Sequence, residues 1–211
     1  MYFNSRRSCV IANNGAVATS QPLAAQAGLD ILKKGGNAVD AAVATAAVLN
    51  VVEPMSTGIG GDVFALVRNS KDGIVKSMNG SGRSGSKSDA SLLKKKGFSS
   101  IPGMGKEGVV SVTVPGTVHG WETLLKDEGT MSFKEVLKPA IKYSFEGFGV
   151  SEIIGNSWAS SVDKLSVNGK NEFLPKGTSP ESESVIKLPE LGNTLREISL
   201  GGSKVFYQGH I

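Results

Sequence analysis

Arg83 is the side chain in this sequence best suited to bind a charged ligand. It lies in the glycine- and serine-rich segment Gly80–Gly85, at the end of a predicted strand. A guanidinium group can bind a carboxylate through two parallel hydrogen bonds, and the backbone N–H groups of such a loop can add further donors. We therefore consider Arg83 a candidate carboxylate-binding residue. The alternative from residue type alone is an arginine exposed to solvent in a loop.

The segment Gly80–Gly85 also matches the pattern Gly-x-Gly-x-x-Gly, which binds dinucleotides when it joins a strand to a helix. No acidic residue ends the next predicted strand, Val109–Val114, where a ribose-binding carboxylate should lie. A second match, Gly103–Gly108, precedes a strand instead of a helix. The Walker A pattern is not matched either, because Ser86 precedes Lys87-Ser88 at the position where that pattern requires glycine. Glycine-rich turns are the favoured interpretation, and a nucleotide-binding module through Gly80–Gly85 is kept as an alternative.

Nucleophilic and metal-binding side chains are scarce. Cys9 is the only cysteine, and His119 and His210 are the only histidines. Nothing in the spacing places Cys9 beside a histidine, and one cysteine forms no disulfide within the chain. A structural zinc site is not expected from so few ligands, and we expect neither a metal nor a cofactor. Gly82–Gly85 is not a nucleophile elbow, because Ser86 stands where the final glycine belongs.

The composition argues against several classes of protein. The chain has 211 residues, of which 39% are hydrophobic, 20% are charged and 27 are glycine, so it can bury a core. Its net charge is +4, but the basic residues are scattered apart from Lys94–Lys96 and no aromatic residues interleave with them. Met1–Asn14 has no apolar stretch of signal-peptide type, and the near-apolar run Ala41–Val52 is too short to span a membrane. We expect a cytoplasmic protein that binds neither nucleic acid nor membranes.

Hydrophobic periodicity and turn residues predict a mixture of helices and strands. Helices are expected at Gln21–Lys34, from Asn37 to Leu49, at Asp89–Lys96, Thr117–Asp127, Ser132–Phe145, Ser151–Leu165 and Pro189–Leu200. Strands are expected at Val63–Arg68, Ile74–Met78 and Val109–Val114, together with a hairpin over Val10–Ala18 around an Asn-Gly turn. Gly97–Gly108 and Asn168–Pro180 are expected to be loops.

The second helix should form the centre of the core. Residues 41–49 carry no charge and mostly small side chains, which is typical of a helix buried on all sides. Asn37 and Asp40 are spaced as a capping box, whereas Thr19 or Ser20 should cap the preceding helix. We expect Gly58–Asp62 to form a sharp turn between layers, with an anion-binding nest as the alternative. No linker divides residues 1–211, so a single domain is predicted.

Four segments of the chain resemble the γ-glutamyltranspeptidase family, and they follow one another in family order. The first is 22–67, which contains GGNAVDAA and GIGGD, and the second is NGSGRSG at 79–85. The third is 114–151, which contains PGTVHGW and GTMSF, and the fourth is VFYQGHI at 205–211. The apolar tail ends without a stop signal, so we expect the chain to continue in nature as a longer precursor.

This resemblance implies an α+β fold, the N-terminal part of the four-layer αββα sandwich of an Ntn hydrolase. The family's threonine nucleophile and oxyanion-hole glycines belong to the small, C-terminal subunit, so no catalytic residue is expected in this chain. The implied substrates are γ-glutamyl amides such as glutathione, and the implied partner is the C-terminal portion of the same precursor. Half of a sandwich would expose an apolar face, so we expect either a homo-oligomer or a missing partner.

The family also has an arginine that binds the α-carboxylate of the substrate, in a pattern Arg-Glu-x-Ala-Pro. The corresponding sequence in this chain is Gly82–Gly85, which lacks the Ala-Pro. Either Arg83 or Ser81 therefore corresponds to that arginine. We assign the substrate-binding role to Arg83. Two alternatives to γ-glutamyl transfer are a related amide acylase and a non-catalytic fragment of a split or truncated gene.

Overall fold

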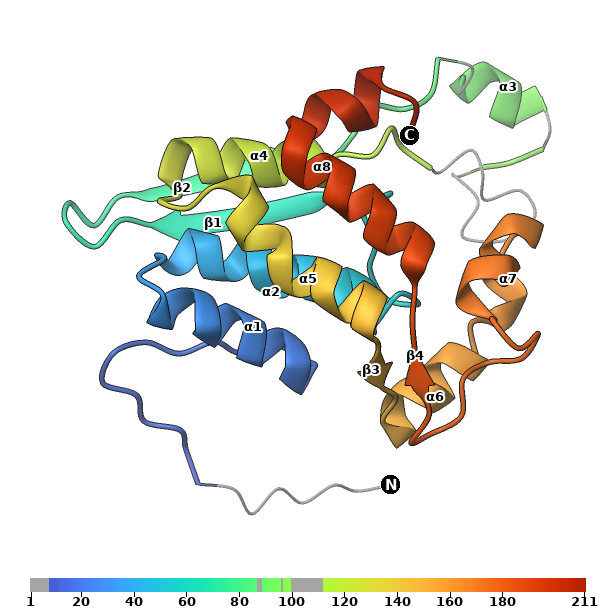
Figure 1. Cartoon of the computed structure of the whole chain (residues 1–211). Coiled ribbons are helices and arrows are strands. Elements are labelled where there is room, and N and C mark those ends of the chain that lie inside the picture. The colour runs from blue at the N-terminus through green and yellow to red at the C-terminus, as the bar shows by residue number, and fades with distance from the viewer. Residues whose placement is uncertain (1–7, 87–88, 96, 100–111) are drawn as a thin grey trace.

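The computed structural model describes residues 8–86, 89–95, 97–99 and 112–211 (Figure 1). The helices are α1 (Pro22–Lys33), α2 (Ala38–Val52), α3 (Ala90–Lys95), α4 (Thr117–Glu128), α5 (Phe133–Glu146), α6 (Glu152–Ala159), α7 (Val167–Phe173) and α8 (Pro189–Gln208). A short 3-10 helix covers Val162–Lys164. The strands are β1 (Val63–Arg68), β2 (Val75–Gly80), β3 (Phe148–Gly149) and β4 (Val185–Ile186).

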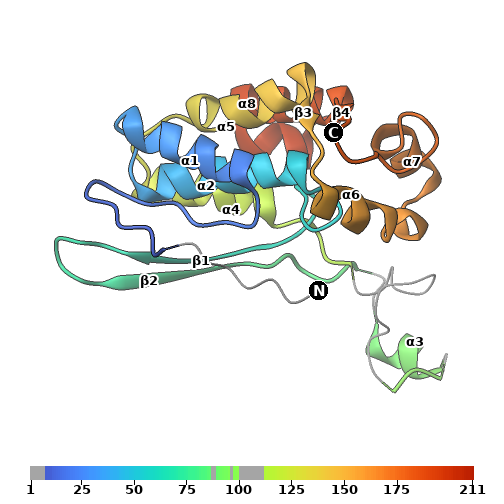
Figure 2. The same ribbon diagram turned by 90° about the horizontal axis from the view of Figure 1, so that it is seen from below.

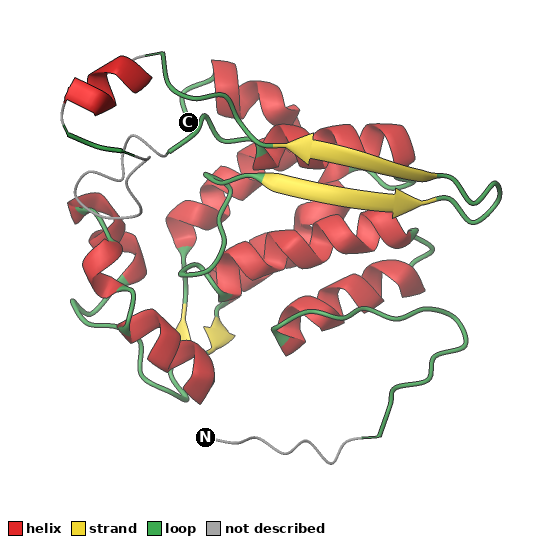
Figure 3. Ribbon diagram, turned by 180° about the vertical axis from the view of Figure 1, so that it is seen from behind, coloured by secondary structure: helices red, strands yellow, loops and turns green. Residues whose placement is uncertain are grey.

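Helices α1, α2, α4, α5 and α8 pack together on one side of a hairpin (Figure 2). Strands β1 and β2 pair in antiparallel register, with Val63 opposite Gly80, and lie along one side of the helical layer (Figure 2). Within that layer α2 packs between α1 and α5, and α5 packs against α8. The short antiparallel pair β3 and β4 joins the end of α5 to the start of α8 (Figure 3).

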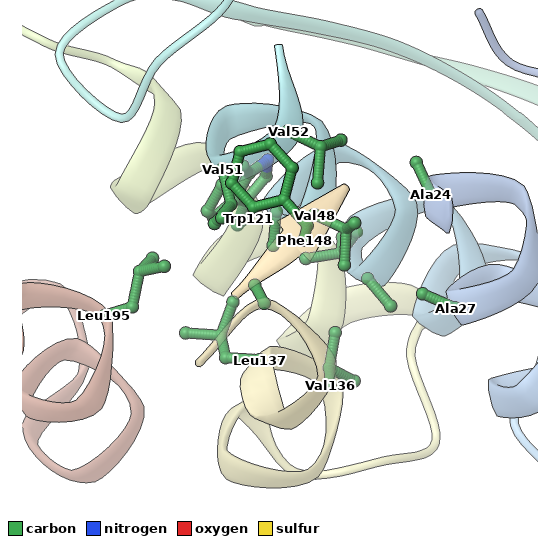
Figure 4. Close-up of a cluster of buried hydrophobic side chains, with 14 of the residues drawn as sticks. Ala24, Ala27, Val48, Val51, Val52, Trp121, Val136, Leu137, Phe148 and Leu195 are labelled. Carbon is green, nitrogen blue, oxygen red and sulfur yellow. The ribbon is translucent and has the colours of Figure 1, made fainter. Parts of the chain in front are cut away.

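Helix α2 lies at the centre of the core, as its composition predicts. Val48, Val51 and Val52 are completely buried, and Trp121 of α4 and Leu137 of α5 pack around them (Figure 4). Full burial of such side chains stabilises the fold by roughly 1.5–3 kcal/mol each. The many alanines of α2 let its neighbours approach from several sides, which explains why a helix without a polar face is stable here.

The predicted cap of α2 is confirmed, whereas the predicted cap of α1 is not. Asn37 and Asp40 form the predicted capping box at the start of α2. The prediction that Thr19 or Ser20 caps α1 is wrong, because Gln21 Oε1 accepts hydrogen bonds from the N–H groups of Leu23 and Ala24. The Ser20 hydroxyl is engaged elsewhere, since it donates to Glu53 Oε2 at 3.0 Å.

The predicted hairpin over Val10–Ala18 is also wrong. This segment is extended but belongs to no strand, and Val10 and Ile11 are exposed. Residues 14–19 lie instead along α1 and α2, with which they line a cavity of about 800 Å³. Contact with the apolar helix surfaces has replaced the local strand pairing that the Asn-Gly turn favours.

Most other predicted elements are confirmed, with differences in extent. The predicted helix Ser151–Leu165 is wrong in length, because α6 ends at Ala159. Helix α7 occupies part of the expected loop Asn168–Pro180, and Ser166 caps it by accepting a hydrogen bond from Gly169 N–H. The predicted strand Val109–Val114 begins outside the described residues, and its described part forms only an isolated bridge between Thr113 and Ser84.

Candidate functional site

Three segments meet around a cavity of about 560 Å³ that contains Arg83 in its wall. The first is the loop Asn79–Arg83, which follows β2, and the second is Val114–Gly116, which leads into α4. The third is the end of α8, which contributes Lys204 and Tyr207. Segments far apart in the sequence therefore form one concave surface, as a ligand site requires.

The glycines of the first two segments are needed where the backbones cross. A Cβ atom on Gly82 would lie 1.4 Å from the carbonyl oxygen of Val114, and one on Gly116 would lie 1.8 Å from that of Gly80. Only glycine permits this approach. These glycines serve chain packing, which favours the turn interpretation of Gly80–Gly85 over a dinucleotide site. The other candidate nucleotide motifs, Gly103–Gly108 and Lys87-Ser88, lie outside the described residues.

Asp62 holds the Arg83 loop in place. Its carboxylate accepts hydrogen bonds from Gly82 N–H at 3.0 Å, Thr113 Oγ1 at 3.0 Å and Ser81 Oγ at 3.3 Å. The Gly82 N–H, followed by the two hydroxyls, lowers the pKa of Asp62 below its ordinary value although desolvation opposes this. Gly58–Asp62 forms the predicted turn, in which Gly61 N–H donates to Gly58 O, and its final residue anchors the neighbouring loop.

The charged side chains that line the cavity are basic. Arg83 is exposed, Lys204 lies on another wall, and His119 also lines the cavity. Among the described lining residues there is no carboxylate. The cavity is therefore suited to an anionic group, and the arginine at its edge can bind a carboxylate in the bidentate manner.

Of the cysteine and the two histidines singled out from the sequence, only His119 lines the Arg83 cavity. Cys9 is exposed in the N-terminal segment. His210 Nε2 lies 3.0 Å from Glu197 Oε2, and the ring of His119 lies edge-on to that of Tyr207. In the ranges the structure describes, no group of histidine, cysteine and acidic side chains could hold a metal ion.

Tyr207 lines the cavity and Asp62 anchors its loop, and the sequence assigned neither of these roles. Asp62 follows a glycine-rich turn, and this acidic end of GIGGD was the available signal. Tyr207 lies in VFYQGHI, which the sequence analysis identified only as an apolar tail and a family-like segment. In the described part of the chain, no helix has the length and apolar character needed to cross a membrane.

Comparisons with known proteins identify the fold and its family. The sequence model of the family described as "Gamma-glutamyltranspeptidase" matches residues 24–211. The glutathione hydrolase proenzyme of Bacillus subtilis (strain 168) is 35% identical over 202 residues, which are 94% of this chain and 34% of the relative. The chain thus spans about a third of the length of this curated relative.

Two solved structures show the same arrangement of elements. The crystal structure of cephalosporin acylase from Bacillus halodurans has a TM-score of 0.89 and 42% identity, over 98% of this chain and 39% of that one. The Helicobacter pylori gamma-glutamyltranspeptidase has a TM-score of 0.81 and 27% identity, over 96% of this chain and 59% of that one. The predicted fold class is confirmed: α+β, part of an Ntn hydrolase. From the family match and these structures together, the chain belongs to the gamma-glutamyltranspeptidase family.

Proposed function

We propose that this chain is the N-terminal part of a γ-glutamyltransferase or hydrolase precursor that acts on γ-glutamyl amides such as glutathione. The observation that carries the proposal is Arg83, an exposed guanidinium in a cavity whose charged lining residues are basic. The chain supplies scaffold and part of the substrate pocket, while the threonine nucleophile is contributed by the C-terminal portion of the same precursor. Family membership and the name of the B. subtilis relative support this assignment.

In the proposed reaction Arg83 binds the α-carboxylate of the γ-glutamyl group and so fixes the distance of the amide carbonyl from the nucleophile. The threonine hydroxyl attacks that carbonyl while its own α-amine accepts the proton. The leaving amine takes up a proton as the C–N bond breaks, and an acyl-enzyme ester remains. Water or an acceptor amine then attacks the ester and releases the glutamyl group.

Between the two candidates for the carboxylate-binding position, the local contacts favour Arg83. The Ser81 hydroxyl donates to Asp62, whereas the guanidinium of Arg83 forms no ion pair with any residue that the structure describes. Arg83 also carries the positive charge that a bidentate contact requires. Ser81→Ala in the full-length protein should therefore change substrate affinity much less than Arg83→Ala.

The decisive experiment measures kcat and KM for a γ-glutamyl anilide with the full-length protein. Arg83→Ala should raise KM about tenfold or more, because a charge-assisted hydrogen bond contributes roughly 1.5–3 kcal/mol, and 1.4 kcal/mol is a factor of ten. Precursor cleavage should still occur, because Arg83 is not part of that reaction. Arg68→Ala, at the exposed end of β1, is the matched control. An unchanged KM for Arg83→Ala would reject the assignment.

A related amide acylase is the second candidate, favoured by the 42% identity to the cephalosporin acylase of B. halodurans. The two candidates differ in what they require of the acyl group. A glutaryl anilide keeps the terminal carboxylate but lacks the α-amino group, so an acylase should accept it. A γ-glutamyltransferase should hydrolyse the γ-glutamyl anilide much faster than the glutaryl compound, and the reverse ratio would favour the acylase.

The partner assignment has its own test in an intact-mass spectrum of the protein purified from its natural source. A second polypeptide that begins with threonine would support the processed precursor. A single species near the 21.9 kDa of this chain would instead favour the non-catalytic fragment. The cytoplasmic location, the homo-oligomer and the absence of nucleic-acid binding stay predictions.

A further inference from the structure

The last turns of α8 are redirected toward the Arg83 cavity by a kink at Gly202. This residue has a φ of 68°, and a Cβ atom there would lie 2.2 Å from Glu122 Oε1. Glu122 of α4 accepts hydrogen bonds from the N–H of Ser203 at 3.0 Å and from its hydroxyl. The segment 203–208 therefore starts again as a helix from a fixed point on α4, with a carboxylate at its N-terminus.

Tyr207 attaches this redirected segment to the wall of the cavity through hydrogen bonds. Its hydroxyl donates to the carbonyl oxygen of Pro115 at 2.7 Å and accepts a hydrogen bond from the His119 N–H at 3.3 Å. The ring stands edge-on to the rings of His119 and Phe206, with centroids 6.5 and 5.0 Å away. Both sides of the phenol are thus held, and its position is fixed.

Pro115 directly follows Val114, whose backbone is hydrogen-bonded to that of Arg83. The N–H of Val114 donates to the carbonyl oxygen of Arg83 at 2.8 Å, and Thr113 bridges to Ser84. Both neighbours of Pro115 therefore contact the Arg83 loop. Val114 is hydrogen-bonded to Arg83, and Gly116 lies against the carbonyl oxygen of Gly80. Releasing Pro115 would loosen the segment 113–116, to which the backbone of Arg83 is hydrogen-bonded.

We propose that Tyr207 is a positioning residue for Arg83, because its hydroxyl fixes the Pro115 peptide and thereby the backbone from which the guanidinium reaches the ligand. The inference rests on the proposed role of Arg83 as the carboxylate-binding residue. Tyr207 acts through the loop and needs no contact with the ligand. The VFYQGHI segment thus has a function at the site, which the sequence pattern alone did not indicate.

The test is calorimetric titration of the full-length protein with L-glutamate, a probe that carries the α-carboxylate and needs no turnover. Tyr207→Phe removes only the hydroxyl, and we expect it to weaken L-glutamate binding about five- to tenfold. Tyr143→Phe is the matched control, because the Tyr143 hydroxyl forms no hydrogen bond with a residue that the structure describes and lies on α5. Tyr143→Phe should bind L-glutamate as the unaltered protein does.

A double-mutant comparison separates positioning from a general effect on the fold. In an Arg83→Ala background, Tyr207→Phe should cause no further loss of L-glutamate affinity, since its effect passes through Arg83. The same loss in both backgrounds would overturn the inference. So would unchanged binding in Tyr207→Phe while Arg83→Ala weakens it, and the proposed function would then stand. If Arg83→Ala itself has no effect on L-glutamate binding, both proposals fall.

Glu122→Gln provides a second variant in case Tyr207→Phe disturbs folding. It keeps the shape of the side chain but weakens the charged anchor of Ser203, so L-glutamate binding should fall about two- to threefold and again only when Arg83 is present. Near-ultraviolet circular dichroism of each variant reports whether the fold is retained. A retained fold with full L-glutamate affinity in Glu122→Gln, together with an unfolded Tyr207→Phe, would overturn the positioning role.

Discussion

Asp40 joins two segments that are 90 residues apart in the sequence. Its carboxylate accepts hydrogen bonds from the N–H of Asn37 and from the N–H groups of Thr130 and Met131, at 2.8 to 3.1 Å, and from the Thr130 hydroxyl at 2.6 Å. Burial alone would raise the pKa of Asp40, but these donors together hold it below the ordinary value of 3.8. The residue is therefore both a helix cap and the link between α2 and the turn before α5.

Asp40→Asn should destabilise the protein by about 2–4 kcal/mol at neutral pH, because one buried acceptor oxygen becomes a donor that faces other donors. A lowered pKa in the folded state means that the stabilisation is complete above pH 3.8 and is lost as the pH falls through the folded-state value. The difference in unfolding free energy between the two proteins should thus shrink in acid. Urea denaturation at pH 7 and near pH 3 measures both effects.

Asp30→Asn is the control for this experiment, because Asp30 is a partly exposed carboxylate on α1 that contacts Gln26 and Lys33. Its effect should stay within about 0.5 kcal/mol, as is usual for surface substitutions. Equal stability of Asp40→Asn and the unaltered protein at pH 7 would show that the network is not stabilising.

At the scale of elements, α1 and α2 approach each other closely at Gly28. A Cβ atom on Gly28 would lie 2.3 Å from Thr45 Oγ1 and 3.1 Å from both methyl groups of Val17. Thr45 cannot easily turn away, because its hydroxyl donates to Ala41 O and its side chain is buried. The close packing of these two helices therefore depends on the missing side chain.

Gly28→Ala should destabilise the protein by about 1–3 kcal/mol, the usual effect of overpacking, in spite of the better helix propensity of alanine. Gly155→Ala in α6 is the contrasting variant, since its nearest contacts of 3.4 to 3.6 Å are ordinary. At Gly155 the better helix propensity of alanine should outweigh any packing cost, so the thermal midpoint should rise slightly. Similar changes in the two variants would contradict the packing argument.

The sequence predicts the elements whose signals are local and misses those that depend on distant packing. The capping box of Asn37 and the apolar run of β1 are local signals, so α2 and the strands β1 and β2 are predicted within a few residues. Residues 10–18 carry a good turn signal, but contact with α1 and α2 decides their course. The same limit applies at the site: the motif indicated Arg83, whereas the contact between Tyr207 and Pro115 joins residues 92 positions apart.

At the scale of the whole molecule, the hairpin has one covered and one open face. Val63, Ala65 and Val67 of β1 are partly buried on the side of the helices, whereas Phe64 and Leu66 are 67% and 78% exposed. In an αββα sandwich, the face of each sheet that points away from its helices packs against the second sheet. The open face is therefore the surface on which we expect the proposed C-terminal portion to pack.

Replacing Phe64 and Leu66 by serine together should have opposite effects in two forms of the protein. In the 211-residue chain alone, the change removes exposed apolar surface and should reduce aggregation, which light scattering measures. In the full-length precursor, it should weaken the sheet–sheet contact and lower the thermal midpoint, because each buried side chain contributes roughly 1.5–3 kcal/mol. Ile153→Ser changes an equally exposed residue of α6 and should alter neither property. A precursor that tolerates the double substitution without loss of stability would mean that another surface holds the two portions together.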